Sequence, residues 1–168
     1  MNKQSHINDQ FLQVGCKIIT VSDTRTKETD KSGKAMIELL EQNNHHIHEY
    51  LIIKDDKQQI QQEIISGVQS EKIDCILLNG GTGISPRDVT IEAIKPLLTK
   101  ELYGFGELFR MLSYTEDIGS SAILSRAIAG TINDKMVFST PGSTGAVRLA
   151  MKKLILPELS HVISEIHK

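Results

Sequence analysis

The sequence predicts an α/β fold: a three-layer sandwich in which a mostly parallel sheet carries helices on both faces and includes a short β-hairpin. Two observations lead to this fold class. Short β-branched runs alternate with segments of helical periodicity through the first half of the chain, and strands joined in this way lie parallel, with crossover helices covering both faces. The length of 168 residues, 39% of them apolar, suits one domain with its own core.

The first half of the chain contains three predicted strands, and the last of them is expected to be buried on both faces. Each is a short apolar run: Lys17–Val21, Tyr50–Ile53 and Ile73–Leu78. Apolar stripes at helical spacing predict the two intervening helices, which carry Ala35, Met36, Leu39 and Leu40 and then Ile60, Ile64, Ile65 and Val68. Asp55 or Asp56 stands where a cap would begin the second helix.

The second half adds further helices and the hairpin. Thr90 is expected to cap a helix that Pro96 cuts or bends. Gly130–Ile132 and Met136–Ser139 flank the turn residues Asn133–Lys135 and predict the hairpin. Other helices carry Phe105, Leu108, Phe109 and Leu112, and later Val147, Ala150, Met151, Leu154, Ile155, Val162, Ile163 and Ile166. We expect residues 1–13, which are mostly polar, to form a flexible N-terminal tail, and residues 14–168 to form the single domain.

Composition argues against several classes of protein. The net charge is -2, from 19 basic and 21 acidic residues, so the chain lacks the basic excess of a nucleic-acid-binding protein. No run of about 18 apolar residues offers a membrane span, and the N-terminus lacks the apolar stretch of a signal peptide. Cys16 and Cys75 are too few for a disulfide framework, and we expect them to be buried, reduced thiols of a cytoplasmic protein.

The segment Asn79–Thr90 lies between a predicted buried strand and a helix. Its three glycines allow positive φ and a close approach of the backbone to a ligand, and exposed N–H groups at a helix start bind phosphate well. The residues expected to bind substrate or nucleotide here are Gly80, Gly81, Thr82, Gly83, Ser85 and Arg87. Arg87 suits bidentate phosphate binding, with a plain salt bridge as the alternative. The segment is neither a Walker loop nor a dinucleotide fingerprint, because Pro86 stands where the last glycine of that fingerprint would fall.

The segment Ser139–Gly145 repeats these features after the hairpin. It presents glycines and hydroxyls at the beginning of a helix, and we expect Pro141, Gly142 and Ser143 to bind ligand. A serine-hydrolase elbow needs a glycine two residues before the serine, where this chain has Pro141. The two glycine segments together therefore predict a phosphorylated ligand that is held at both ends.

Acidic residues follow each of the first three predicted strands. Ser22 and Asp23 end the first strand, Asp55 and Asp56 follow the second, and Asp88 lies in the first glycine segment. Carboxylates beside phosphate repel it unless a cation lies between them, and Mg²⁺ bound by one or two carboxylates plus phosphate oxygens is the common arrangement. Helix capping is the alternative role for Asp55, Asp56 and Asp88.

At these residues the chain resembles the MoaB/MogA family of molybdenum cofactor biosynthesis proteins, whose fold also occurs in gephyrin. The resemblance runs from about Gly15 to Ser164. It is carried by Thr20–Arg25 with Asp30–Gly33, by Gly80–Gly83 through Arg87–Thr90, by Pro141–Ser143, and by Lys100–Arg110, which is typical of the MoaB branch. Several motifs in matching order are more specific than any one glycine segment.

The resemblance implies adenylyl transfer. MogA-like members transfer AMP from Mg-ATP to the terminal phosphate of molybdopterin, release pyrophosphate, and pass the product to a MoeA-like protein for molybdate insertion. By the same resemblance, the catalytic acids are Asp55 and Asp88, which would also bind Mg²⁺, with Asp56 as the substitute for Asp55. Ser22 and Asp23 would line the rim of the site. The family forms trimers, and its MoaB branch often forms hexamers, so a homo-oligomer is expected.

A function from another class fits the same residues. The protein could be a non-catalytic molybdopterin-binding or scaffold protein of the same pathway. Acidic residues beside anion-binding amides favour the enzyme, because a scaffold has less need of them. A phosphate-binding module unconnected with molybdenum is the third alternative.

Overall fold

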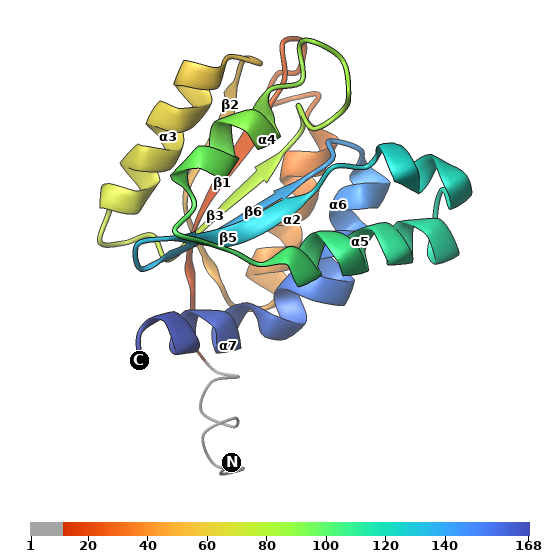
Figure 1. Ribbon diagram of the computed structural model, residues 1–168. Helices are drawn as coiled ribbons and strands as arrows, with labels where there is room; N and C mark the ends of the chain where they lie inside the picture. The colour runs from red at the N-terminus through yellow and green to blue at the C-terminus, as the bar shows by residue number, and fades with distance from the viewer. Residues whose placement is uncertain (1–11) are drawn as a thin grey trace.

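The computed structural model describes residues 12–168 and contains a six-stranded sheet with helices on both faces (Figure 1). The strands are β1 (Gly15–Val21), β2 (His46–Ile53), β3 (Cys75–Asn79), β4 (Lys100–Glu101), β5 (Ile128–Ile132) and β6 (Lys135–Thr140). Their order in the sheet is β2-β1-β3-β6-β5-β4. Strands β2, β1, β3 and β6 are parallel, whereas β5 pairs antiparallel with β6 on one side and with β4 on the other. The predicted three-layer α/β fold with a hairpin is confirmed.

The helices form two layers around this sheet (Figure 1). They are α2 (Lys31–Gln42), α3 (Lys57–Gln69), α4 (Thr90–Ile94), α5 (Tyr103–Glu116), α6 (Thr144–Ala150) and α7 (Leu156–Ile166), with the short helices η1 (Lys95–Leu97) and η2 (Gly119–Leu124) and the π-helical stretch η3 (Met151–Ile155). Helices α2, α5, α6 and α7 pack on one face and α3 and α4 on the other. Along β3, Leu77 belongs to the first core, and Ile76 and Leu78 belong to the second. Consecutive side chains of a strand that is buried on both faces point to opposite layers.

Several details differ from the predicted elements. Thr90 is the first residue of α4 rather than its cap, which is Val89, and its hydroxyl donates to the carbonyl of Gly80. Pro96 does end α4, since it lies in η1. Strand β4 and helix η2 were not predicted. Strand β4 has only two residues, which is too short for a periodic pattern, and Ala122 is the one buried residue of η2. The expected final helices are joined without a break through η3.

Residues 1–11 of the predicted tail lie outside the described part of the chain. The other two tail residues contact the domain: the Leu12 carbonyl accepts a hydrogen bond from the Ser160 hydroxyl (2.9 Å), and Gln13 Oε1 lies 3.0 Å from Nε2 of His46. Both cysteines are buried and free, as predicted. Among residues 12–168, no helix is long and apolar enough to cross a bilayer.

The strand order determines where a ligand can bind. From β1 the chain crosses to β2 on one side and then returns to β3 on the other side of β1. In an open α/β sheet, such a reversal opens a crevice outside the carboxyl ends of the two central strands. The segments after β1, β3 and β6 therefore lie side by side at one edge of the sheet, and those after β3 and β6 are the two glycine segments of the sequence.

A buried polar network centred on Asp30 lies beneath this edge. Asp30 is the N-cap of α2 and is fully buried. Its carboxylate accepts hydrogen bonds from the hydroxyls of Thr20 (2.6 Å) and Tyr50 (2.7 Å) and from the N–H of Gly33 (3.0 Å). Burial by itself raises the pKa of Asp30, but these hydrogen bonds outweigh it and hold the pKa below the ordinary 3.8. The network thus links the ends of β1 and β2 to the start of α2.

We predict that Asp30→Asn lowers the free energy of unfolding at pH 7 by about 3 kcal/mol, because an amide replaces a charged acceptor among four donors, the fourth being the Ser32 hydroxyl (3.1 Å). The folded pKa of Asp30 is depressed, so its contribution is complete above pH 3.8 and is lost as the pH falls through the folded pKa. Urea unfolding of both proteins measures the difference. Asp134→Asn, in the exposed β5–β6 turn, is the control. Equal stability of Asp30→Asn and the wild type would contradict this role.

Candidate functional site

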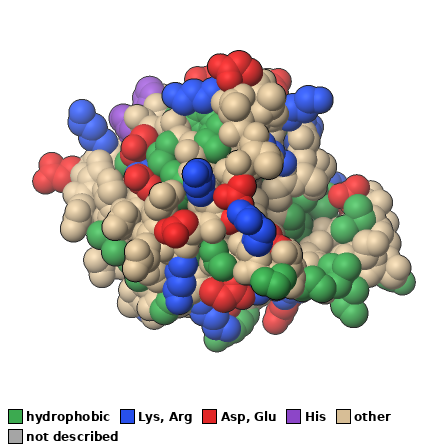
Figure 2. All heavy atoms as spheres, turned by 90° about the horizontal axis from the view of Figure 1, so that it is seen from above, with side chains coloured by type: hydrophobic (Ala, Val, Ile, Leu, Met, Phe, Trp, Pro, Cys, Tyr) green, Lys and Arg blue, Asp and Glu red, His purple; other side chains and the backbone are tan. Residues whose placement is uncertain are grey.

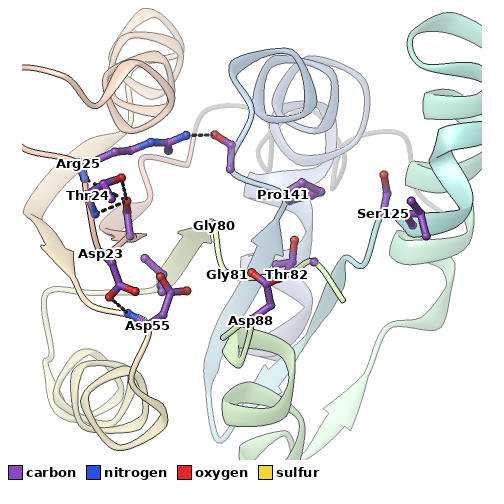
Figure 3. A pocket seen from close by; sticks show the side chains of 15 residues that line it. Asp23, Thr24, Arg25, Asp55, Gly80, Gly81, Thr82, Asp88, Ser125 and Pro141 are labelled. Carbon is purple, nitrogen blue, oxygen red and sulfur yellow. Dashed lines mark hydrogen bonds between the residues drawn. The ribbon is translucent and has the colours of Figure 1, made fainter. Parts of the chain in front are cut away.

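An open pocket of about 470 Å³ lies at the edge where the parallel strands end (Figure 3). A volume of this size is typical of small-molecule sites. The pocket is lined by Val21, Ser22, Asp23, Thr24, Arg25, Asp55, Gly80, Gly81, Thr82, Gly83, Asp88, Leu124, Ser125, Pro141 and Gly142. Figure 3 shows Asp23 and Asp55 on one side of the Gly80–Gly81 turn, with Thr82 and Asp88 on the other. Segments that are far apart in sequence thus surround one hollow.

Three of the residues expected at the site do not line this pocket. Ser143 caps α6, because its Oγ accepts a hydrogen bond from the N–H of Ala146 (3.1 Å). The Ser85 Oγ lies 3.4 Å from the N–H of Arg87. The guanidinium of Arg87 pairs with the carboxylate of Asp23, which is the salt-bridge alternative for this residue. All the other predicted site residues line the pocket.

The first glycine segment turns sharply where β3 ends. Gly80 and Gly81 have φ values of +94° and +66°, which favour glycine. A Cβ on Gly80 would lie 2.2 Å from the carbonyl oxygen of Val21, and one on Gly81 would lie 2.7 Å from Oδ1 of Asp55. The sequence therefore needs glycine here for two reasons, the backbone conformation and the close approach of β1 and of the acidic residue.

The N–H groups of this turn are available to a ligand. Within residues 12–168, no hydrogen bond from the N–H of Gly81, Thr82 or Gly83 is formed. Successive free backbone N–H groups of this kind form the concave anion-binding sites that hold phosphate in other folds. The turn that the sequence predicts to bind phosphate has the backbone that this binding needs.

The acidic residues differ in their roles. The Asp56 carboxylate caps α3 by accepting from the N–H of Gln59 (2.8 Å), whereas Asp55 lines the pocket. Burial, and then the nearby Asp88 carboxylate, raise the pKa of Asp55 above 3.8. Asp88 Oδ2 accepts from the N–H of Ser85 (3.0 Å), and Asp23 Oδ1 accepts from the N–H of Asp55 (3.2 Å). Of the two alternatives left open by the sequence, Asp55 is therefore the one that lines the pocket.

The second glycine segment is tied to the first segment and to β1. Arg25 donates to the carbonyl of Gly142 (2.7 Å) and to the hydroxyl of Ser32 (2.6 Å), and so joins this turn to the Asp30 network (Figure 3). A Cβ on Gly142 would lie 3.0 Å from Cα of Gly80. The two glycine turns are therefore in close contact.

Five of the lining residues were not among the predicted site residues: Val21, Thr24, Arg25, Leu124 and Ser125. Arg25 lies within the motif Thr20–Arg25, which carries the family resemblance. The sequence therefore marked this residue but assigned it no role in the site. Leu124 ends η2, which the sequence did not predict, and Ser125 follows it. No local pattern marks them, since only the tertiary fold brings them to the pocket.

The donor set suits a metal ion that is shared with a ligand. Within the described chain, no group of three or more His, Cys, Asp or Glu side chains could hold a metal ion. Asp55 and Asp88 supply two carboxylates, which is what Mg²⁺ uses when phosphate oxygens and water complete its six ligands. The pocket therefore places backbone N–H groups without a partner in the described chain beside two carboxylates.

The comparisons with known proteins agree with this geometry. Residues 17–161 match the family described as "Probable molybdopterin binding domain". Molybdenum cofactor biosynthesis protein B of Bacillus subtilis is 63% identical over 168 residues, and the match covers 100% of this chain and 99% of the relative. The protein of the same name from Staphylococcus carnosus is 54% identical over 171 residues, and the match covers 100% of both chains.

Solved structures show the same relationship. A crystal structure of a molybdenum cofactor biosynthesis protein B superposes with a TM-score of 0.91 at 63% identity, covering 93% of this chain and 97% of that one. The tungsten cofactor synthesizing protein MoaB of Pyrococcus furiosus gives a TM-score of 0.82 at 38% identity, with 93% and 98% covered. A MogA structure gives 0.81 at 26%, with 90% and 99% covered. The chain belongs to the MoaB/MogA family of molybdenum cofactor biosynthesis proteins.

Proposed function

We propose that the protein acts in molybdenum cofactor biosynthesis as a molybdopterin adenylyltransferase, using Mg-ATP to form adenylyl-molybdopterin and release pyrophosphate. One observation carries the proposal: the unpaired N–H groups of Gly81–Gly83 and the carboxylates of Asp55 and Asp88 lie in one pocket. Phosphate-binding donors and cation-binding acceptors are the two things that phosphoryl chemistry requires from a protein. The match to a probable molybdopterin binding domain supports molybdopterin as the acceptor.

The reaction makes one bond and breaks one. An oxygen of the terminal phosphate of molybdopterin attacks the α-phosphorus of ATP, and the bond from that phosphorus to the bridging oxygen of pyrophosphate breaks. The turn amides would bind and orient phosphate oxygens in line, which supplies the alignment that such a reaction needs. No side chain has to form a covalent intermediate, which agrees with a pocket that is built from glycine, hydroxyl and acidic residues.

Asp55 and Asp88 would hold a Mg²⁺ ion that arrives with the nucleotide. When bound, the ion neutralises phosphate charge that would otherwise repel the two carboxylates. Burial and then the neighbouring Asp88 carboxylate raise the pKa of Asp55, and a cation bound between the two carboxylates would favour its charged form. Asp23 would position Asp55 through the backbone N–H that it accepts from, while Arg87 neutralises Asp23.

We also propose partners for the protein. A MoeA-like protein would receive the adenylylated pterin and insert molybdate. Further copies of the chain would cover the apolar flank formed by α5 and η2, which gathers hydrophobic side chains on one side of the molecule (Figure 2). Its exposed large hydrophobic residues are Tyr103, Leu108, Met111, Tyr114, Ile118, Ile123 and Leu124. Exposed hydrophobic side chains gathered in this way are typical of an interface, and a trimer or hexamer would bury them.

The direct test is to incubate the purified protein with molybdopterin, ATP and Mg²⁺ and to measure pyrophosphate and adenylylated pterin. We expect both products to appear in equal amounts and only when Mg²⁺ is present. Molybdopterin that binds without either product would show the non-catalytic scaffold instead. Failure to bind either molybdopterin or ATP would overturn the proposal.

We predict that Asp55→Asn and Asp88→Asn each reduce pyrophosphate release about 100-fold or more, because each removes a charge next to the reacting phosphates. Circular dichroism should show an unchanged fold. Asp56→Asn is the matched control, since asparagine also caps helices well and Asp56 caps α3 without lining the pocket. Normal turnover by Asp55→Asn would remove Asp55 from its role.

The titration of Asp55 gives a second prediction. In the wild type its carboxyl carbon, followed by NMR, should titrate above pH 3.8, because burial and Asp88 both disfavour the charged form. In Asp88→Asn the midpoint should fall, since the like charge is gone, yet it should stay above 3.8 because burial remains. An unchanged midpoint would show that the two carboxyl groups do not interact.

The proposed interface gives a third prediction. Met111→Glu places a charge at the centre of the apolar flank of α5, where the wild-type side chain is about half exposed. We expect analytical ultracentrifugation to show the wild type as a trimer or hexamer and the variant as smaller species. Glu116→Lys is the control. It changes a residue at the end of α5 that is already charged, so no hydrophobic side chain of the flank is replaced. A monomeric wild type would refute the interface.

A further inference from the structure

Arg126 binds the outer side of the first glycine turn. It lies between η2 and β5 and does not itself line the pocket. Its Nε donates to the carbonyl of Thr82 (2.8 Å), and its Nη2 donates to the carbonyl of Gly83 (2.7 Å). Its Nη1 pairs with Glu92 of α4, and this pairing lowers the pKa of Glu92. One guanidinium therefore connects the turn, the following helix and the segment before β5.

The bonds of Arg126 complete a pattern along the turn. The carbonyls of Gly80 and Gly81 accept from the hydroxyl and the N–H of Thr90, at 2.9 Å and 3.0 Å. With the two carbonyls that Arg126 binds, four successive carbonyl oxygens, those of residues 80–83, are bonded within the protein. The N–H groups of the following residues, 81–84, form no hydrogen bond within the described chain.

The planarity of the peptide bond explains this pattern. In a trans peptide, the carbonyl of one residue and the N–H of the next point in opposite directions, and no cis peptide occurs among the described residues. A bond that holds a carbonyl therefore also fixes the opposite N–H. Thr90 in this way orients the N–H groups of Gly81 and Thr82, and Arg126 orients those of Gly83 and Ile84.

An arginine suits this task better than a lysine. Its planar fork presents several N–H groups in fixed directions, whereas the ammonium group of lysine is a single flexible point charge. Arg126 uses three of its nitrogens on three different groups, and Glu92 fixes the fork from the side of α4. Neutralisation by Glu92 also means that the role of Arg126 is orientation more than charge.

We propose that Arg126 is the positioning residue of the phosphate-binding turn, holding the carbonyls of Thr82 and Gly83 so that the adjoining N–H groups are set for phosphate before the nucleotide arrives. This inference rests on the proposed function, because it assigns a residue to the same site. Arg126 acts through the turn and does not contact the substrate.

The test compares Mg-ATP binding by wild type, Arg126→Ala and Arg126→Lys, using isothermal titration calorimetry. We expect both variants to bind about 10- to 100-fold more weakly, as is usual when a group that orients a binding residue is lost. Arg126→Lys retains the positive charge, so a loss of Mg-ATP affinity in this variant would reflect the missing guanidinium geometry. Ethylguanidinium added to Arg126→Ala should restore part of the affinity, which a general loss of stability would not allow. Arg148→Ala removes a surface arginine paired with Glu38 and is the control.

A second measurement tests the turn without any ligand. In ¹⁵N relaxation experiments, the N–H groups of Gly83 and Ile84 should be rigid in the wild type and mobile in Arg126→Ala, while those of Gly81 and Thr82, which Thr90 orients, should change less. Unchanged affinity and unchanged relaxation in Arg126→Ala would overturn the positioning role while leaving the proposed function in place. A wild type that does not bind Mg-ATP would overturn the proposed function, and the positioning role with it.

Discussion

In a planar peptide group, a hydrogen bond that holds the carbonyl also fixes the direction of the opposite N–H, and the geometry of the pocket depends on this constraint. At the Gly80–Gly83 turn, Thr90 and Arg126 donate hydrogen bonds to the carbonyls. The donors come from α4 and from the segment before β5, so the turn is held by distant parts of the fold. Because buried or constrained backbone polar groups are costly to leave unpaired, the fold fixes the turn before any ligand binds.

The Asp30 network supports the other side of the same pocket. Asn79, at the end of β3, donates to the hydroxyl of Thr20 on β1, and Thr20 donates to Asp30. Arg25 then connects this network to the second glycine segment, because it donates both to the hydroxyl of Ser32 and to the carbonyl of Gly142. The ends of β1, β3 and β6 are thereby joined by hydrogen bonds immediately below the segments that line the pocket. Stability and ligand binding share these residues, so a substitution here is expected to affect both.

The sequence predicted the fold class and the glycine turns because both have local causes. Alternating strands and helices leave a periodic pattern in the sequence. Positive φ at Gly80 and Gly81 favours glycine, and glycine is identified directly from the sequence. The choice between Asp55 and Asp56 was not local, since both residues suit a helix cap and only the turn of the chain after β2 decides which one faces the pocket. Arg126 and Ser125 had no signal at all, because more than 40 residues separate Arg126 from the carbonyls it binds. Arg87 was assigned to phosphate by its chemistry, whereas its carboxylate partner, Asp23, lies 64 positions away in the chain.

The central claim is that the amides of the Gly80–Gly83 turn bind phosphate, and its most direct test is to follow backbone ¹H–¹⁵N resonances while pyrophosphate and Mg²⁺ are added to the protein. The account predicts that the largest shifts occur at Gly81, Thr82 and Gly83, with smaller shifts at Gly142 across the pocket and none at Gly119, a positive-φ glycine in η2. Pyrophosphate that binds while the resonances of Gly81, Thr82 and Gly83 stay unchanged would contradict it.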